Sequence, residues 1–153
     1  MKTKMKTLFL YIIAAILIFS GCSTNKTPLT SDGFKEKMEE AGFEIYDITD
    51  QYEEGLLDAA FVTMKEDYKL EFYVLNTSDD AKAMYNANKS DFEDLRSGNS
   101  AYNSVNLGNH ASYKLTTEDG YYVVSRIDNT LVFVKTDKKN KDAINKVLKD
   151  LGY

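Results

Sequence analysis

The chain has 153 residues, of which 43% are apolar and 28% charged, with a formal net charge of −5 and a single proline. This length and composition predict one domain with an ordinary hydrophobic core and exclude a disordered chain. One cysteine excludes an internal disulfide, a thiol relay and a cysteine-rich metal cage. One histidine leaves at most one histidine base.

The first 21 residues have the three parts of a secretory signal. Three lysines end at Lys6, an apolar run follows at Leu8–Phe19, and the small residues Ser20 and Gly21 come next. Twelve helical residues span about 18 Å, which is short for a hydrocarbon core of about 30 Å. We therefore expect a signal peptide over residues 1–21; an uncleaved N-terminal helix is the alternative.

The only cysteine directly follows this segment. The stretch Phe19-Ser20-Gly21-Cys22 resembles the lipobox of bacterial lipoproteins, although Phe19 stands where an aliphatic residue is usual. The resemblance implies that Cys22 receives a diacylglyceryl thioether and that the chain is cut just before it. Two acyl chains, at about 0.8 kcal/mol per buried methylene, would anchor the protein stably.

The charge balance also favours a lipid anchor. Removal of the signal would take three of the 19 basic residues and none of the 24 acidic ones, which leaves a net charge of −8. Such a body is repelled by anionic lipid and by nucleic acid. We therefore expect no nucleic-acid partner, and attachment through Cys22 to the outer, extracytoplasmic face of the cell membrane.

The rest of the chain divides into a linker and a domain. Residues 22–30 are predicted to be the lipidated cysteine and a flexible tether, because Ser23–Thr30 is polar and has no hydrophobic period. Residues 31–153 are predicted to form one α+β domain. Its expected helices are Ser31–Gly42, a second helix capped by Thr77 or Ser78 and ended by Gly98, and a third running from an Asp137 cap to Gly152.

Six strands are expected between these helices. They are Phe43–Thr49, Leu56–Met64, Tyr68–Asn76, Ala111–Thr117, Tyr121–Asp128 and Thr130–Lys135, with Asn99–Asn109 as a polar loop. The predicted order is α-βββ-α-βββ-α, an antiparallel sheet of about six strands with helices on one face. Leu70-Glu71-Phe72 echoes Leu131-Val132-Phe133, so a duplicated αβββ unit is an open alternative.

No catalytic, cofactor or metal motif is evident. His110 lies between a polar loop and a strand, where a solvated histidine, a general base and a lone metal ligand are all open interpretations. Adjacent carboxylates point in different directions and do not by themselves form an acid–base pair. These doublets are Glu39-Glu40, Glu53-Glu54, Asp79-Asp80 and Glu118-Asp119. We predict no catalytic residues, no metal site and no cofactor.

The tyrosines suggest a binding surface. Tyr73, Tyr113, Tyr121 and Tyr122 lie on predicted strands, and neighbouring strand residues face opposite sides, so some of these rings could form an aromatic surface for a peptide or glycan. Burial in the sheet is the alternative. Arg126 joins this candidate surface, unless it points inward and pairs with Asp128 or Asp58.

From Phe34 to Tyr153 the chain resembles small, uncharacterised extracytoplasmic lipoproteins of low-GC Gram-positive bacteria. The resemblance rests on Leu70-Glu71-Phe72-Tyr73, on Ser125-Arg126-Ile127-Asp128-Asn129-Thr130 and on the closing Leu151-Gly152-Tyr153. It implies a lipid anchor and a small α+β body, and it carries no site residues.

The resulting hypothesis is a non-enzymatic binding or interaction module. Its partner would be an envelope protein, a wall peptide or a glycan. The alternatives are an immunity or sequestering lipoprotein for a cationic peptide, and a small envelope hydrolase that uses His110.

Overall fold

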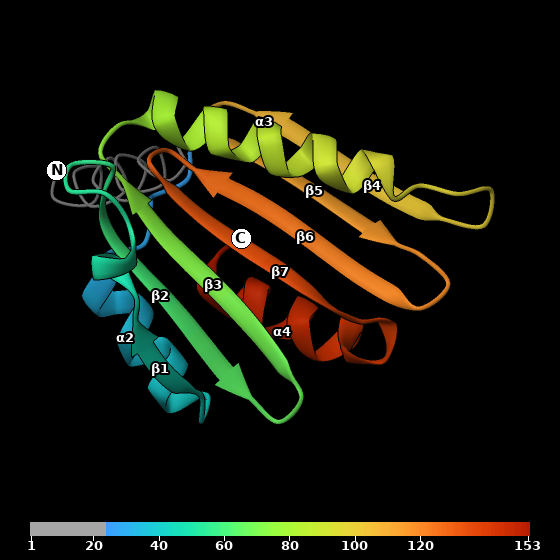
Figure 1. Ribbon diagram of the computed structural model, residues 1–153, viewed down its shortest axis with the longest axis horizontal. Coiled ribbons are helices and arrows are strands. Elements are labelled where there is room, and N and C mark those ends of the chain that lie inside the picture. Colours follow the sequence, from blue (N-terminus) through green and yellow to red (C-terminus); the bar gives the residue numbers. More distant parts are fainter. Residues whose placement is uncertain (1–23) are drawn as a thin grey trace, which may run out of the picture.

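A computed structural model describes residues 24–153 (Figure 1). The predicted signal peptide, the lipobox residues Phe19, Ser20 and Gly21, and the lipidation site Cys22 lie outside the described residues. Within them, the chain folds as one α+β domain with three α-helices and a seven-stranded sheet. The predicted fold class is confirmed.

Every neighbouring pair of strands in the sheet is antiparallel. The strand order is β1-β2-β3-β7-β6-β5-β4, so two meanders meet where β3 pairs with β7. The strands are β1 (Glu44–Asp47), β2 (Leu57–Lys65), β3 (Tyr68–Leu75), β4 (Ala101–Leu107), β5 (His110–Thr116), β6 (Gly120–Ile127) and β7 (Thr130–Asp137).

The expected polar loop at Asn99–Asn109 is wrong, because Ala101–Leu107 forms the edge strand β4. It pairs with β5 over seven residues, and all seven of its own residues are exposed. The alternation of apolar and polar residues that reveals a strand in a sequence arises when one face of the strand is buried and the other is exposed. A strand with no buried face lacks that signal, which explains a count of seven strands rather than about six.

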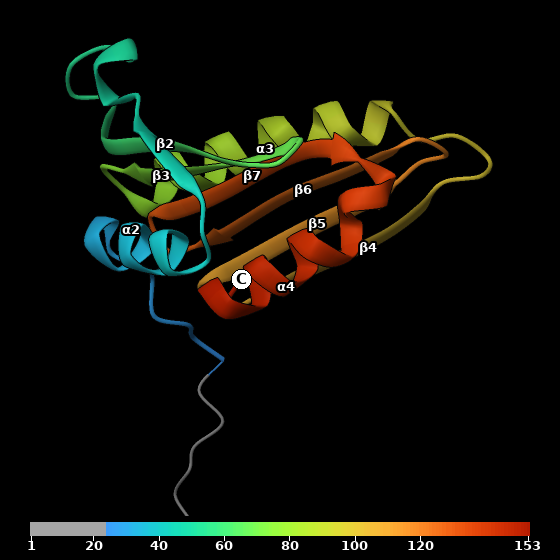
Figure 2. The same cartoon turned by 90° about the horizontal axis from the view of Figure 1, so that it is seen from below.

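The expectation of helices on one sheet face is also wrong. The helices α2 (Ser31–Glu40) and α4 (Lys141–Leu151) pack on one face, and α3 (Ser78–Asp94) packs on the other (Figure 2). The central strands are apolar on both sides: Val123 and Val132 face α2 and α4, whereas Val124 and Leu131 face α3. Each face therefore requires its own cover.

The predicted helix ends are confirmed in part; α3 ends at Asp94 with Leu95 as its C-cap, and not at Gly98. Thr77 caps α3 by accepting a hydrogen bond from the backbone N–H of Asp80, and Gly152 ends α4 in the left-handed region with φ +91°. The predicted Asp137 cap is wrong. Asp137 ends β7, and a short 3-10 turn, η2 (Lys138–Asn140), precedes α4. A second such turn, η1 (Thr49–Gln51), follows β1.

Part of the expected tether lies against the domain. The backbone N–H of Lys26 donates to Asn109 Oδ1 at 2.8 Å, and Asn109 Nδ2 donates to the Lys26 carbonyl at 2.7 Å. Leu29 packs on the core beside α2. These contacts fix the point where the chain enters the domain, beside the β4–β5 turn.

The core contact beneath α2 gives a test of this architecture. The rings of Phe34 and Phe72 stack with centroids 4.2 Å apart, and both side chains are fully buried. Phe34→Ala should lower the free energy of unfolding by roughly 3–5 kcal/mol, because it removes a large buried ring and leaves a cavity. Urea denaturation measures this. Leu56→Ala, at a side chain 52% exposed, should change it by less than about 0.5 kcal/mol. Equal losses of unfolding free energy in the two variants would contradict the packing of Phe34 in the core.

Candidate functional site: the open sheet face

Part of the α3 side of the sheet is covered by neither α3 nor the short turn η1. In Figure 1, α3 runs over the part of the sheet that contains β5 and β6. On the same side, Ile48 and Tyr52 at the η1 turn cover the start of β2, where Ala60 is fully buried. The uncovered part consists of β1, the second half of β2 and the adjoining ends of β3 and β7. We call this surface the open sheet face. Its exposed or half-exposed side chains include Glu44, Tyr46, Val62, Met64, Lys69, Glu71, Tyr122 and Lys135.

The strand register places these side chains in rows across the sheet. Tyr46 pairs with Val62, which pairs with Glu71, and Glu71 pairs with Phe133 of β7. Tyr46 is 47% exposed and Met64 44% exposed. The surface therefore presents apolar and aromatic groups to solvent next to charged ones, which is the mixture found at protein-binding sites.

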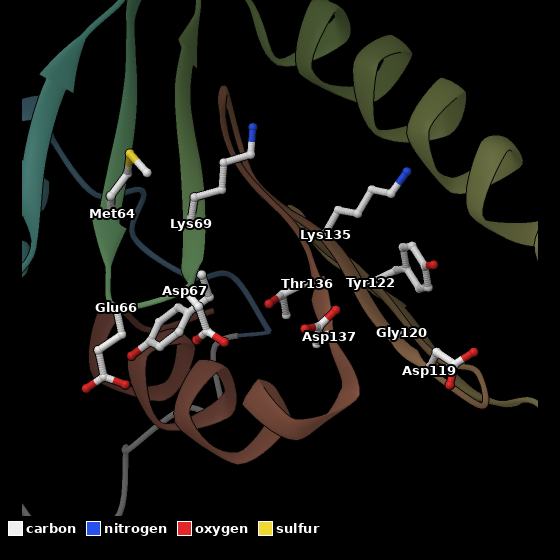
Figure 3. Close-up of a pocket in the computed structure, with 11 residues that line it drawn as sticks. Met64, Glu66, Asp67, Lys69, Asp119, Gly120, Tyr122, Lys135, Thr136 and Asp137 are labelled. Carbon is white, nitrogen blue, oxygen red and sulfur yellow. The ribbon is translucent and has the colours of Figure 1, made fainter.

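The β3–β7 ladder ends within this face. Its last pair is Glu71 with Phe133, and continuation by two residues would place Lys69 directly opposite Lys135. Like charges opposite one another on neighbouring strands are destabilising. The strands separate there and enclose a hollow of about 540 Å³, which we call the fork. Figure 3 shows Lys69 and Lys135 extending in the same direction from its two sides.

The two lysines of the fork have different partners. Lys69 Nζ lies 2.8 Å from Glu71 Oε1, and the hydroxyl of Tyr73 donates to the other carboxylate oxygen at 2.6 Å. Burial and the hydrogen bond to Glu71 raise the pKa of Tyr73, which keeps its phenol protonated as a donor. No ion pair is formed by Lys135 among the described residues. Lys135 is therefore the free cation of the fork.

Acidic side chains surround this cationic centre. Glu66, Asp67, Asp119 and Asp137 line the outer part of the fork. Asp67 pairs with Lys139, and the hydrogen bond from Lys139 lowers the pKa of that carboxyl. A second hollow of about 610 Å³ continues over Tyr46, Tyr52 and Tyr73 and shares Met64 and Lys69 with the fork. The surface can thus bind a ligand through charge, ring contacts and shape together.

The five residues predicted as a binding surface do not form one. Tyr122 lines the fork, and Tyr73 lines the adjoining hollow. Tyr113 is fully buried on the α3 side, and Tyr121 is buried on the opposite face, where its hydroxyl donates to Asn145 at 2.8 Å. Arg126 is buried at the other end of β6, and its partners are backbone oxygens of Asn109 and Asp128 rather than a carboxylate.

His110 is the first residue of β5, and within residues 24–153 no hydrogen bond orients its side chain for catalysis. Its Nδ1 is buried without a partner in the described part of the chain, and so is the hydroxyl of Ser112, two residues further along the same face. A histidine base is normally oriented by a bonded carboxylate or carbonyl. The structure does not bring such a group to this nitrogen.

Two further features of residues 24–153 bear on chemistry. No group of three or more His, Cys, Asp or Glu side chains there is placed to hold a metal ion. No helix among these residues has the length and apolar character needed to cross a membrane.

The comparisons with known proteins do not assign this arrangement to a family. No protein-family model matches the chain, and neither the curated proteins nor the solved structures contain a significant match.

Sequence reasoning missed Met64, Lys69 and Lys135. Lys69 and Lys135 alternate with buried residues on their strands, which predicts exposure but not proximity. Lys69 and Lys135 come close because β3 pairs with β7. The sequence contains only a weak signal for this pairing. The echo between Leu70-Glu71-Phe72 and Leu131-Val132-Phe133 marks the paired segments.

Charge repulsion as the cause of the fork can be tested by Lys135→Glu. A carboxylate opposite Lys69 should raise the free energy of unfolding by a few tenths of a kcal/mol, up to about 1 kcal/mol, with the gain reduced by salt. Chemical denaturation at low and high ionic strength measures the change. Lys146→Glu on the exposed side of α4 makes the same change in net charge. If both variants behave alike, repulsion does not explain the fork.

Proposed function

We propose that this protein is a lipid-anchored extracytoplasmic lipoprotein that acts as a non-enzymatic binding module through its open sheet face. The observation that carries the proposal is this face itself: part of one side of the sheet has no covering helix, and exposed Met64 and Tyr46 line its two adjoining hollows. A side of a sheet with apolar groups is normally covered, and exposed apolar patches mark interaction sites.

The chemistry of the fork favours a peptide or protein partner that offers a carboxylate. Lys135 has no ion pair in the described residues and could accept one, while Met64 and Tyr122 give an apolar contact on either side. We therefore favour an acidic segment of an envelope protein or a wall peptide as the partner. Sequestration of a cationic peptide is the second candidate, because the carboxylates of Glu66, Asp67, Asp119 and Asp137 also line the fork.

Attachment by Cys22 gives the first test. Cys22→Ser should move the protein from the membrane fraction to the soluble fraction, or leave its signal uncut, because no acyl chains can be added. Fractionation of cells and the mass of the product measure both outcomes. Ser20→Ala, which keeps a small residue in the lipobox, should remain anchored. An unchanged membrane fraction and processed mass for Cys22→Ser would refute the anchor.

The binding surface is tested by photo-crosslinking on intact cells. A benzoylphenylalanine in place of Met64 should give one specific adduct, and the same group in place of Lys146 on α4 should not. In the variant that carries benzoylphenylalanine at position 64, Lys135→Glu should reduce the yield of the adduct, because it replaces the cation that the partner's carboxylate would meet. If positions 64 and 146 give the same adducts in the same yield, the open sheet face has no specific partner.

A further inference from the structure

Arg126 is a buried cation without a carboxylate partner in the described part of the chain. The residue is 4% exposed. Its Nη1 donates to the carbonyl oxygens of Asn109 and Asp128 at 3.1 Å each, and its Nε is buried with no hydrogen-bond partner. A guanidinium cannot lose its charge in a protein, and buried charges are normally paired. The two carbonyls hold Arg126 in place but do not neutralise it.

A small pocket lies against this cation. It has a volume of about 210 Å³ and is enclosed by the first half of α3, by β4 and by the β4–β5 turn, with Lys82, Tyr85, Asn86, Asn106, Gly108, Ala111 and Arg126 as its lining. Every polar side chain in this set can donate a hydrogen bond, and none is a carboxylate. In a chain with more acidic than basic residues, such a lining favours an anion.

The surroundings keep these donors in their donating state. Burial raises the pKa of Tyr85, so its phenol stays protonated at neutral pH. Lys82 lies at the rim and is held by Asp79 at 2.8 Å. The pocket is smaller than the roughly 300 Å³ at which sites for drug-sized ligands begin. Its size therefore suits one small anionic group.

We propose that this pocket binds an oxyanion of the phosphate class, with Arg126 as its counter-charge and the Asn86 and Asn106 amides as hydrogen-bond donors. Arginine matches the oxygens of phosphate in geometry and charge. The site lies apart from the fork, which is lined by different residues. It requires neither the partner nor the lipid anchor proposed above.

The place where the chain enters the domain suggests two sources for the anion. A Cβ on Gly108 would meet Asn25 Oδ1 at 2.6 Å and the Thr24 carbonyl at 2.9 Å, so residues 24 and 25 lie beside the pocket. If Cys22 is lipidated, as proposed, two residues of chain keep the Cα of the lipidated cysteine within about 7 Å of that of Thr24. The phosphate of a lipid headgroup and free phosphate would then both be in reach.

The test uses the full chain purified in detergent. Inorganic phosphate should raise the melting temperature with saturation, compared with chloride at equal ionic strength. Glycerophosphoglycerol, the deacylated headgroup of phosphatidylglycerol, is the second probe. A response to both probes supports the site and a lipid headgroup as the source of the anion. A response to phosphate alone supports the site and free phosphate as the source. No response to either would overturn the proposal.

Asn106→Asp separates anion binding from a purely structural role for Arg126. It places a carboxylate in the pocket without removing the arginine, so the melting temperature without ligand should rise and phosphate affinity should fall by roughly tenfold or more. Asn103→Asp, on the opposite face of β4, makes the same charge change and should retain the phosphate response. A phosphate response in Asn106→Asp equal to that of the unmodified chain would contradict the assignment.

Discussion

The four-pair ladder between β3 and β7 joins the two meanders of this domain into one sheet. Through it, Phe72 and Val132 continue the core under α2 and α4, and Tyr73 and Leu131 continue the core under α3. The ladder stops where Lys69 and Lys135 would face each other. The pairing that holds the two halves together therefore also determines where the sheet opens into the fork.

Local signals predicted most elements, and the non-local arrangement was not predicted. Thr77 and Gly152 marked helix ends correctly because capping depends on a few neighbouring residues. β4 was missed because no face of it is buried. The side on which each helix packs depends on strands far away in sequence. By contrast, strand alternation alone places Tyr121 and Tyr122 on opposite faces, as the structure has them. Of the candidate surface, only Tyr73 and Tyr122 lie at the open sheet face.

The arrangement of the halves also bears on a duplicated αβββ unit. A two-fold axis perpendicular to the sheet would relate two antiparallel meanders in this order, and it would keep their leading helices on one face. Instead α2 and α3 lie on opposite faces, and the second half has four strands. The echoed residues are not equivalent in position either, because Leu70 and Phe72 face α2 and α4 whereas Leu131 and Phe133 face α3.

Among the several cations of residues 24–153 that form no ion pair, Lys135 and Arg126 each line a hollow. Lys135 is exposed in the fork, and Arg126 is buried beside the entry of the chain, so they suit different ligands. An exposed cation among apolar groups fits a partner's carboxylate at a surface, whereas an enclosed one fits a small anion. The proposed lipid anchor would place both near the membrane, where the net charge alone would not keep them.

Hydrogen exchange measured by mass spectrometry on native membranes and on the detergent-purified full chain tests the central claim most directly. Binding at the open sheet face predicts slower exchange in native membranes for peptides that cover residues 62–71 and 131–137, with unchanged exchange in α4. Equal exchange of these peptides in both preparations would contradict a partner at this face.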